Sequence, residues 1–156
     1  MVYYISFKIK GSSPKPHAMK LLSCKCSEKW ADVAPLVLRL AVGAVFIVHG
    51  YLKVVDVAAF GGMLTSLSVP LPAFFAWVVT IVELGGGVLL VLGLLTHWAS
   101  KLLAIDMFVA MLLVHAKNGF LMSNNGIEFT LVLFAAAVAL MITGAGKWSV
   151  NQMWRK

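Results

Sequence analysis

The chain has 156 residues, of which 61% are apolar and 12% are charged, and its formal net charge is +7. About half of the residues of a soluble domain are apolar, so this composition excludes an ordinary soluble domain and predicts an integral membrane protein in a lipid bilayer. Most of the basic residues lie in the two terminal segments rather than on one folded face, so we expect no nucleic-acid partner.

Residues 1–30 are expected to form a basic, mostly disordered cytoplasmic tail. This segment contains six lysines and no apolar run long enough to span a membrane. Its cysteines, Cys24 and Cys26, lack the second pair that a four-ligand zinc site needs. We therefore expect reduced thiols and no metal site, with a redox or metal role as the alternative. Met19 is an alternative start of translation, because everything that the fold requires lies downstream of it.

Residues 31–156 are expected to form one domain with four membrane spans. The first span runs from about residue 33 to residue 51. At about 100° per residue, one stripe of this helix gathers two cations, two glycines and a phenylalanine within about 80°. The stripe comprises Arg39, Gly43, Phe46, Gly50 and Lys53. We expect it to face the interior of the bundle.

The second span is predicted from about residue 72 to residue 95, after a weaker segment at 54–71 that fits a loop with a short interfacial helix. Glu83 lies near the middle of this span and is followed by three glycines. Glycines weaken an isolated helix but allow a neighbouring helix to approach closely. We therefore expect close helix packing at Gly43, Gly50, Gly86 and Gly87.

The third span is predicted at about 98–115 and the fourth at about 127–143. The segment between them contains Asn-Gly pairs, which are typical of turns, and a basic segment with tryptophan follows the fourth span. Since the four apolar segments are joined by short connections, the predicted fold class is all-α, an integral membrane four-helix antiparallel bundle.

The distribution of lysine and arginine predicts the orientation of the bundle. The six lysines of the tail, Lys101 and the three basic residues after the fourth span fall on one side, whereas Lys53 and Lys117 fall on the other. Cytoplasmic segments carry an excess of basic residues. We therefore expect a multi-pass protein whose N and C termini are both cytoplasmic.

Three charged residues lie well inside the predicted spans, away from their ends: Arg39, Glu83 and Asp106. A charged group in hydrocarbon is costly unless it faces a partner, so the cheapest arrangement pairs Arg39 with one or both carboxylates. Two interpretations remain open. The charges form a purely structural network that fixes helix packing, or they belong to a site that also handles protons or a polar head group.

A second polar group is expected at the outer ends of the helices, and it is a candidate pocket for a quinone head group. It comprises His49, Lys53, His115, Asn118 and Glu128. Simpler explanations stand beside this one. Glu128 is favoured by the dipole at a helix N-terminus, and histidines at a membrane interface are often only solvated. Ligation of haem or a metal by the two histidines is a further alternative.

Four segments of the sequence resemble the DoxX family of four-helix membrane proteins: LRLAVGAVFIVHGYLKV, IVELGGGVLLVLGLLTHWAS, HAKNGF and EFTLVLFAAAVALMITGAGKWSV. The resemblance covers about residues 35–150. It assigns family positions to Arg39, Gly43, Gly50, Lys53, Glu83, Asn118, Gly119, Glu128, Gly144 and Gly146, and none to Asp106. The family is named after a small subunit associated with a terminal quinol oxidase and with thiosulfate:quinone oxidoreductase activity, so the resemblance implies membrane redox chemistry at the quinone pool.

Three functional hypotheses follow. The favoured one is an accessory subunit of the bacterial inner membrane that binds a quinone or a redox partner subunit. The alternatives are a scaffold without chemistry and a small proton-coupled transporter. Quinone is the only cofactor for which the resemblance gives an indication, and both the formation of a homo-oligomer and the assignment of an enzymatic reaction stay open.

Overall fold

The structure, a computed structural model, describes residue 30 and residues 33–153. The chain divides into two units, residues 1–30 and 31–156, and every helix named below lies in the second. The predictions for the tail, including those for Cys24, Cys26 and Met19, lie outside the described residues.

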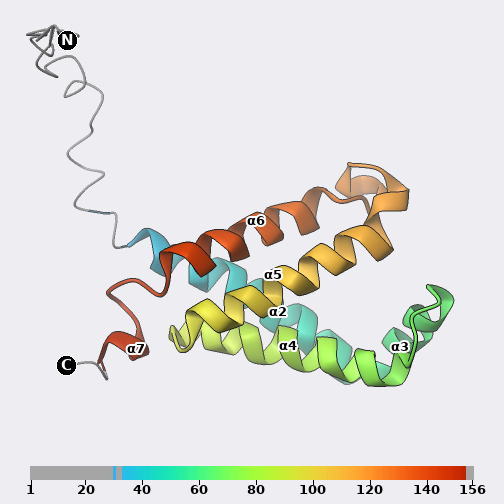
Figure 1. The fold of residues 1–156 in the computed structure, drawn as a ribbon, viewed down its shortest axis with the longest axis horizontal. Coiled ribbons are helices and arrows are strands. Elements are labelled where there is room, and N and C mark those ends of the chain that lie inside the picture. The colour runs from blue at the N-terminus through green and yellow to red at the C-terminus, as the bar shows by residue number, and fades with distance from the viewer. Residues whose placement is uncertain (1–29, 31–32, 154–156) are drawn as a thin grey trace, which may run out of the picture. The chain divides into compact units, whose positions relative to one another are not determined.

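Four helices run alongside one another in alternating directions (Figure 1). They are α2 (Ala34–Val55), α4 (Pro72–Leu92), α5 (Thr96–Ala110) and α6 (Glu128–Thr143). The part of the chain that the structure describes contains no strand. The predicted fold class is therefore confirmed as an all-α, four-helix antiparallel membrane bundle.

The helices differ in the thickness of membrane that they can cross. α2, α4 and the helical stretch Thr96–Asn118 are long and apolar enough to cross a bilayer. α6 has 16 residues and measures about 24 Å, at about 1.5 Å per residue. α6 is therefore shorter than the three candidate spans, and its crossing of the membrane stays a prediction.

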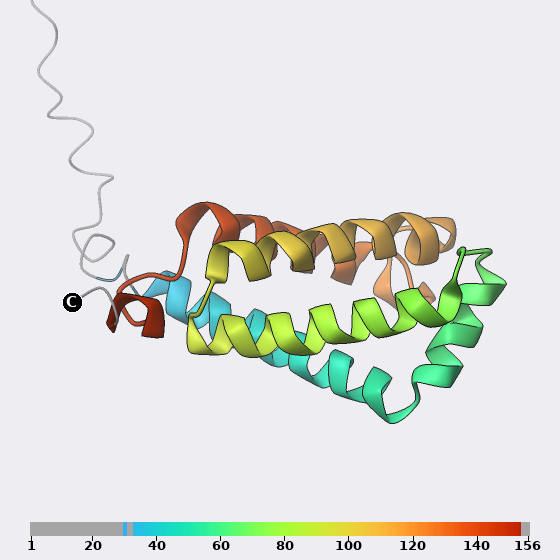
Figure 2. The ribbon, with the colours of Figure 1, turned by 60° about the horizontal axis from the view of Figure 1, so that its bottom comes forward.

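The short helix expected between residues 54 and 71 is α3 (Val57–Ser66). Asp56 begins it, because its side-chain oxygen accepts a hydrogen bond of 3.0 Å from the backbone N–H of Ala59, as a helix-capping residue does. α3 lies across the end of the bundle where α2 ends and α4 begins (Figure 2), and it packs against α4. The first turns of α4 therefore extend past the end of α2 to meet it.

A tight turn joins α4 to α5. Gly93 has a positive φ of 70°, which glycine adopts without steric cost, and the N–H of Leu94 donates to the carbonyl of Leu89 at 2.9 Å. This is the usual hydrogen-bonded ending of an α-helix at glycine. Since α5 begins at Thr96, the end of α4 and the beginning of α5 lie side by side at this turn.

The end of α5 changes its helical form. It continues into the π-helix η2 (Met111–His115) and the 3-10 helix η3 (Ala116–Asn118), and a loop containing the 3-10 helix η4 (Met122–Asn124) leads to α6. Short π-helices are rare and are frequently found at functional sites.

Glycines set the close contact between α2 and α4. A Cβ atom on Gly50 would meet the backbone of Leu84, and one on Gly87 would meet the carbonyl of Gly43 and the N–H of Ile47. Gly86 instead faces the side chain of Leu103 on α5. Three of the four glycines expected to pack helices thus lie where α2 crosses α4, and the fourth lies between α4 and α5.

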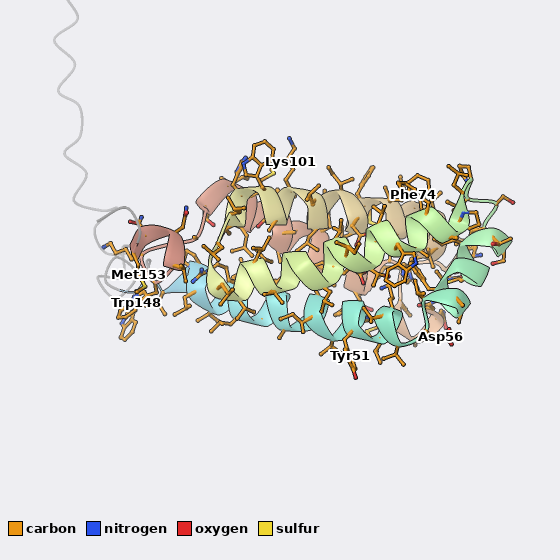
Figure 3. The ribbon with its side chains drawn as sticks, turned by 90° about the horizontal axis from the view of Figure 1, so that it is seen from below. Tyr51, Asp56, Phe74, Lys101, Trp148 and Met153 are labelled. Atoms are coloured by element: carbon orange, nitrogen blue, oxygen red, sulfur yellow. The ribbon has the colours of Figure 1, made fainter. Side chains whose placement is uncertain are left out.

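The packed core fills the half of the bundle nearer the α4–α5 turn and continues to Phe46, Met107 and Leu133 at the cavity. Leu90, Leu103 and Leu140 have no exposed surface there. Trp148 lies at this same end, and Asp56 lies at the opposite end near α3 (Figure 3). The half of the bundle near α3 contains Lys53, Glu83, Asp106 and a cavity.

Candidate functional site

A cavity of about 530 Å³ lies in the half of the bundle near α3. This volume is within the usual range for a small-molecule site. The walls come from α2, α3, α4, α5, η2, the loop before α6, and α6 itself. Apolar residues predominate, and the polar residues among them are His49, Lys53, Glu83, Asp106, His115, Asn125 and Thr130.

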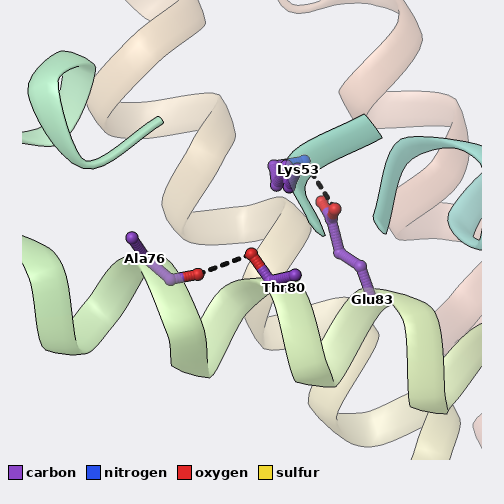
Figure 4. A network of polar contacts seen from close by, with 4 residues as sticks. All are labelled: Lys53, Ala76, Thr80 and Glu83. Carbon is purple, nitrogen blue, oxygen red and sulfur yellow. Dashed lines mark hydrogen bonds and ion pairs between the residues drawn. The ribbon is translucent and has the colours of Figure 1, made fainter. Parts of the chain in front are cut away.

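Lys53 and Glu83 form an ion pair at one wall of the cavity (Figure 4). The Nζ–Oε2 distance is 2.5 Å, and the side chain of Glu83 is 5% exposed. Lys53 Nζ also lies 5.1 Å from the ring centre of Phe60 on α3, a cation–π contact. One turn before Glu83, Thr80 is buried and its hydroxyl donates to the carbonyl of Ala76, so Thr80 is not part of the ion pair.

Asp106 on α5 is the second carboxyl group of the cavity. It interacts electrostatically with both Glu83 and Lys53, and its Oδ2 atom is buried with no hydrogen-bond partner. Buried polar atoms are nearly always hydrogen-bonded, so this oxygen is a candidate acceptor for a hydrogen bond from a ligand or a water molecule. Two carboxyl groups and one ammonium group therefore meet in the cavity, and their charges sum to zero when the carboxyl groups hold one proton between them.

His115 reaches the same cavity because of the π-helix. It follows Asp106 by nine residues, which in a regular α-helix would put the two side chains about 180° apart. The wider turn of η2 (Met111–His115) changes that register, and both residues line the cavity. His115 Nδ1 lies 2.8 Å from the carbonyl of Asn125. Because a carbonyl only accepts hydrogen bonds, Nδ1 donates, and in the neutral ring Nε2 is the acceptor.

Asn118 and Glu128 support the loop over the cavity rather than its wall. The side-chain amide of Asn118 donates to the carbonyl of Asn125 at 3.1 Å. Glu128 Oε2 accepts a 2.9 Å hydrogen bond from the backbone N–H of Met122. Neither side chain lines the cavity, so of the five residues expected at a pocket, these two hold a loop in place and the other three form the wall.

His49 is the third of those wall residues. It lies on α2, and its ring centre is 6.2 Å from that of Phe129 on α6. Its side chain is exposed. His49 therefore stands at the edge of the cavity, on the side where α2 meets α6.

The expected pairing of Arg39 with a carboxylate is wrong. Arg39 has no exposed surface, and its Nη2 donates to the carbonyl of Trp148 at 2.5 Å. The antiparallel register explains the difference. A Cβ atom on Gly93 would collide with the Arg39 guanidinium, and Gly93 is ten residues, or about 15 Å of helix, from Glu83.

Lys53, and not Arg39, is the cation that pairs with the buried carboxylate of Glu83. Both cations lie on one stripe of α2, so the choice depended on how far α4 is shifted along α2. The ten residues of α3 lie between α2 and α4 in the chain. As a result, Glu83 in the middle of α4 lies beside the end of α2 instead of its centre. The length of the weak segment at 54–71 was the only signal in the sequence for this shift.

Comparison with known proteins identifies the family of the chain. The family model described as DoxX matches residues 34–116. The chain is 33% identical over 118 residues to a Bacillus subtilis (strain 168) protein named "Putative oxidoreductase CatD", covering 73% of this chain and 81% of that protein. No solved structure gives a significant match.

Two further relatives are named as membrane proteins. "Uncharacterized membrane protein Rv3486" of Mycobacterium tuberculosis (strain ATCC 25618 / H37Rv) is 30% identical over 130 residues, covering 76% of this chain and 80% of its own. "Inner membrane protein YqjF" of Escherichia coli (strain K12) is 28% identical over 131 residues, covering 83% and 98%. The family match covers more than half of the chain, and the chain belongs to the DoxX family of membrane proteins.

Proposed function

We propose that the protein binds a quinone or quinol in the cavity near α3 and serves as an accessory subunit of a quinone-linked oxidoreductase in the bacterial inner membrane. The observation that carries this proposal is the placement of an ammonium group, two carboxyl groups and two imidazoles in one apolar-walled cavity. The names of the relatives CatD and YqjF agree with a redox role and with the inner membrane.

The polar groups of the cavity match what a quinone ring requires. Each carbonyl oxygen of the ring accepts a hydrogen bond, and Lys53 can donate one. Each hydroxyl of the quinol donates, and His115 Nε2 and the unpartnered Oδ2 of Asp106 can accept. The apolar walls suit the ring faces, as in most small-molecule sites.

The proposed reaction is the two-electron oxidation of a quinol. Oxidation of one quinol breaks two O–H bonds and releases two protons and two electrons. The protons pass to His115 and to the Asp106–Glu83 pair, and from there to water. The electrons pass to an electron-accepting partner subunit that carries its own flavin or metal centre. Reduction of a quinone reverses these transfers.

The orientation of the bundle completes the proposal. With both termini on the cytoplasmic side, as the basic residues indicate, the cavity lies toward the outer face of the membrane. Protons released there would leave on that side. A reporter fused to each terminus and tested for cytoplasmic activity checks this orientation.

The first experiment is purification from the native membrane in mild detergent, followed by solvent extraction and mass spectrometry. We expect a quinone at close to one per chain. Lys53→Met should lose it. Lys101→Met is the matched control, because Lys101 also lies over an aromatic ring, 5.4 Å from the ring centre of Trp98, but outside the cavity (Figure 3). Purified wild-type protein that neither carries a quinone nor binds added quinone would refute the proposal.

A further inference from the structure

α4 and α5 separate as they run from their shared turn toward α3 (Figures 1 and 2). Near the turn they are in contact, since Gly86 lies against the side chain of Leu103. Farther along, residues of both helices line the cavity: Val79 and Glu83 on α4, and Asp106, Met107, Val109 and Ala110 on α5. The cavity therefore extends between α4 and α5, and α2, α3 and α6 form its other walls.

The residues that line this side of the cavity and are also exposed are apolar. Val109 is 45% exposed, Leu113 is 50% exposed, and Met63 on α3 is 39% exposed. Val109 and Leu113 lie four residues apart, so in a helix they are neighbours on one face. The exposed face of a membrane helix at this depth meets lipid chains, so the cavity has an apolar edge toward the bilayer.

The two carboxyl groups of the same cavity have buried oxygen atoms. Glu83 is buried at 3% exposure, and the Asp106 oxygen that lacks a partner is also buried. A ligand that fits both parts has a polar ring and a hydrocarbon chain. Its ring meets Lys53, Glu83 and Asp106, and its chain leaves along Val109 and Leu113.

We propose that the gap edged by Met63 on α3, Val109 near the end of α5 and Leu113 on η2 is a portal through which the hydrocarbon tail of the bound ligand extends into the bilayer. The ligand is thus a prenylated quinone that reaches the site from the lipid, and a water-soluble quinone would use only the inner part of the site. This inference rests on the proposed quinone function and adds the route and the class of ligand.

The test compares a ring with and without a tail. The probes are 2-methyl-1,4-naphthoquinone and the same ring with a tetraprenyl chain, titrated against protein in lipid nanodiscs. In the variant Val109→Trp with Leu113→Trp, we expect the tetraprenyl quinone to bind at least tenfold more weakly and the tail-less quinone to bind within twofold of wild type. Leu112→Trp is the control, because Leu112 is 54% exposed but does not line the cavity.

The outcomes separate the two proposals. Tight binding of the tetraprenyl quinone to the double variant, equal to wild type, overturns the portal while leaving the site intact. Equal weakening of both probes also overturns it, because the substitutions would then act on the ring site. Failure of wild-type protein to bind either probe refutes the quinone function itself.

Discussion

Lys53 at the end of α2 and Glu83 in the middle of α4 form an ion pair of 2.5 Å at the wall of a cavity. The ion pair connects α2 to α4 at the end of the bundle where α3 lies. The buried carboxylate of Glu83 is thus paired with a side chain that lines the cavity, so the stability of the bundle and the proposed binding of a ligand depend on the same ion pair.

Removal of Lys53 should destabilise the bundle. Lys53→Met leaves Glu83 buried without its cation, and breaking a buried pair costs about 3 kcal/mol or more. Because Lys53 is 19% exposed, we expect a loss of about 2 kcal/mol in the free energy of unfolding. Chemical denaturation in detergent measures it, with Lys101→Met as control. The double change Lys53→Met with Glu83→Leu should recover most of the loss, and a double variant less stable than Lys53→Met would contradict the pairing.

The glycine contact between α2 and α4 gives a second prediction. Gly50→Ala puts a methyl group against the backbone of Leu84, and overpacking of this kind costs about 1–3 kcal/mol. Gly85→Ala is the matched control, because a Cβ atom there meets nothing within 4 Å and alanine favours a helix. Thermal unfolding should show a lower midpoint for Gly50→Ala alone. An equal effect at both positions would argue against close packing at Gly50.

Arg39 should hold the segment that follows α6. Its guanidinium donates to the carbonyl of Trp148, and Ser149 beside it is buried. In Arg39→Gln, we expect hydrogen exchange at residues 144–153, which include α7 (Val150–Met153), to become at least tenfold faster, while exchange in α4 near Glu83 stays unchanged. Faster exchange around Glu83 instead would indicate that Arg39 acts on the cavity.

The tautomer of His115 gives a prediction about the site itself. Because Nδ1 donates to the carbonyl of Asn125, the neutral ring should carry its proton on Nδ1 and leave Nε2 open. Solid-state nitrogen NMR of histidine-labelled protein, with His115→Gln used for assignment, distinguishes the two forms. An Nε2-protonated neutral ring would remove the proton acceptor that the proposed quinol oxidation uses.

The loop before α6 should depend on Asn118. Its amide donates to the carbonyl of Asn125 at 3.1 Å, next to the bond from His115. Asn118→Ala should cost about 1 kcal/mol, the usual net value of one hydrogen bond, and should speed hydrogen exchange in residues 119–127. Lys117→Ala is the neighbouring control, since Lys117 is exposed. No change in the exchange of the loop would contradict a role for Asn118 in holding it.

The sequence alone determined the fold class, the four helices and the glycines at their contacts. Long apolar segments can satisfy their backbone in a membrane only as helices, and glycine on a helix face permits close approach wherever the partner lies. The spacing of residues in the sequence was therefore enough to identify the stripe of α2 that contains Arg39, Gly43, Gly50 and Lys53.

Only the tertiary structure decided which charges meet. The partner of Glu83 depends on how far α4 is displaced along α2 by α3, and a displacement along the helix axis leaves no periodic signal in the sequence. The same holds for His115, whose direction is set by one π-helical turn. Helix faces follow from local geometry, whereas the register between helices and the irregular turn at Met111–His115 are fixed by packing across the whole bundle.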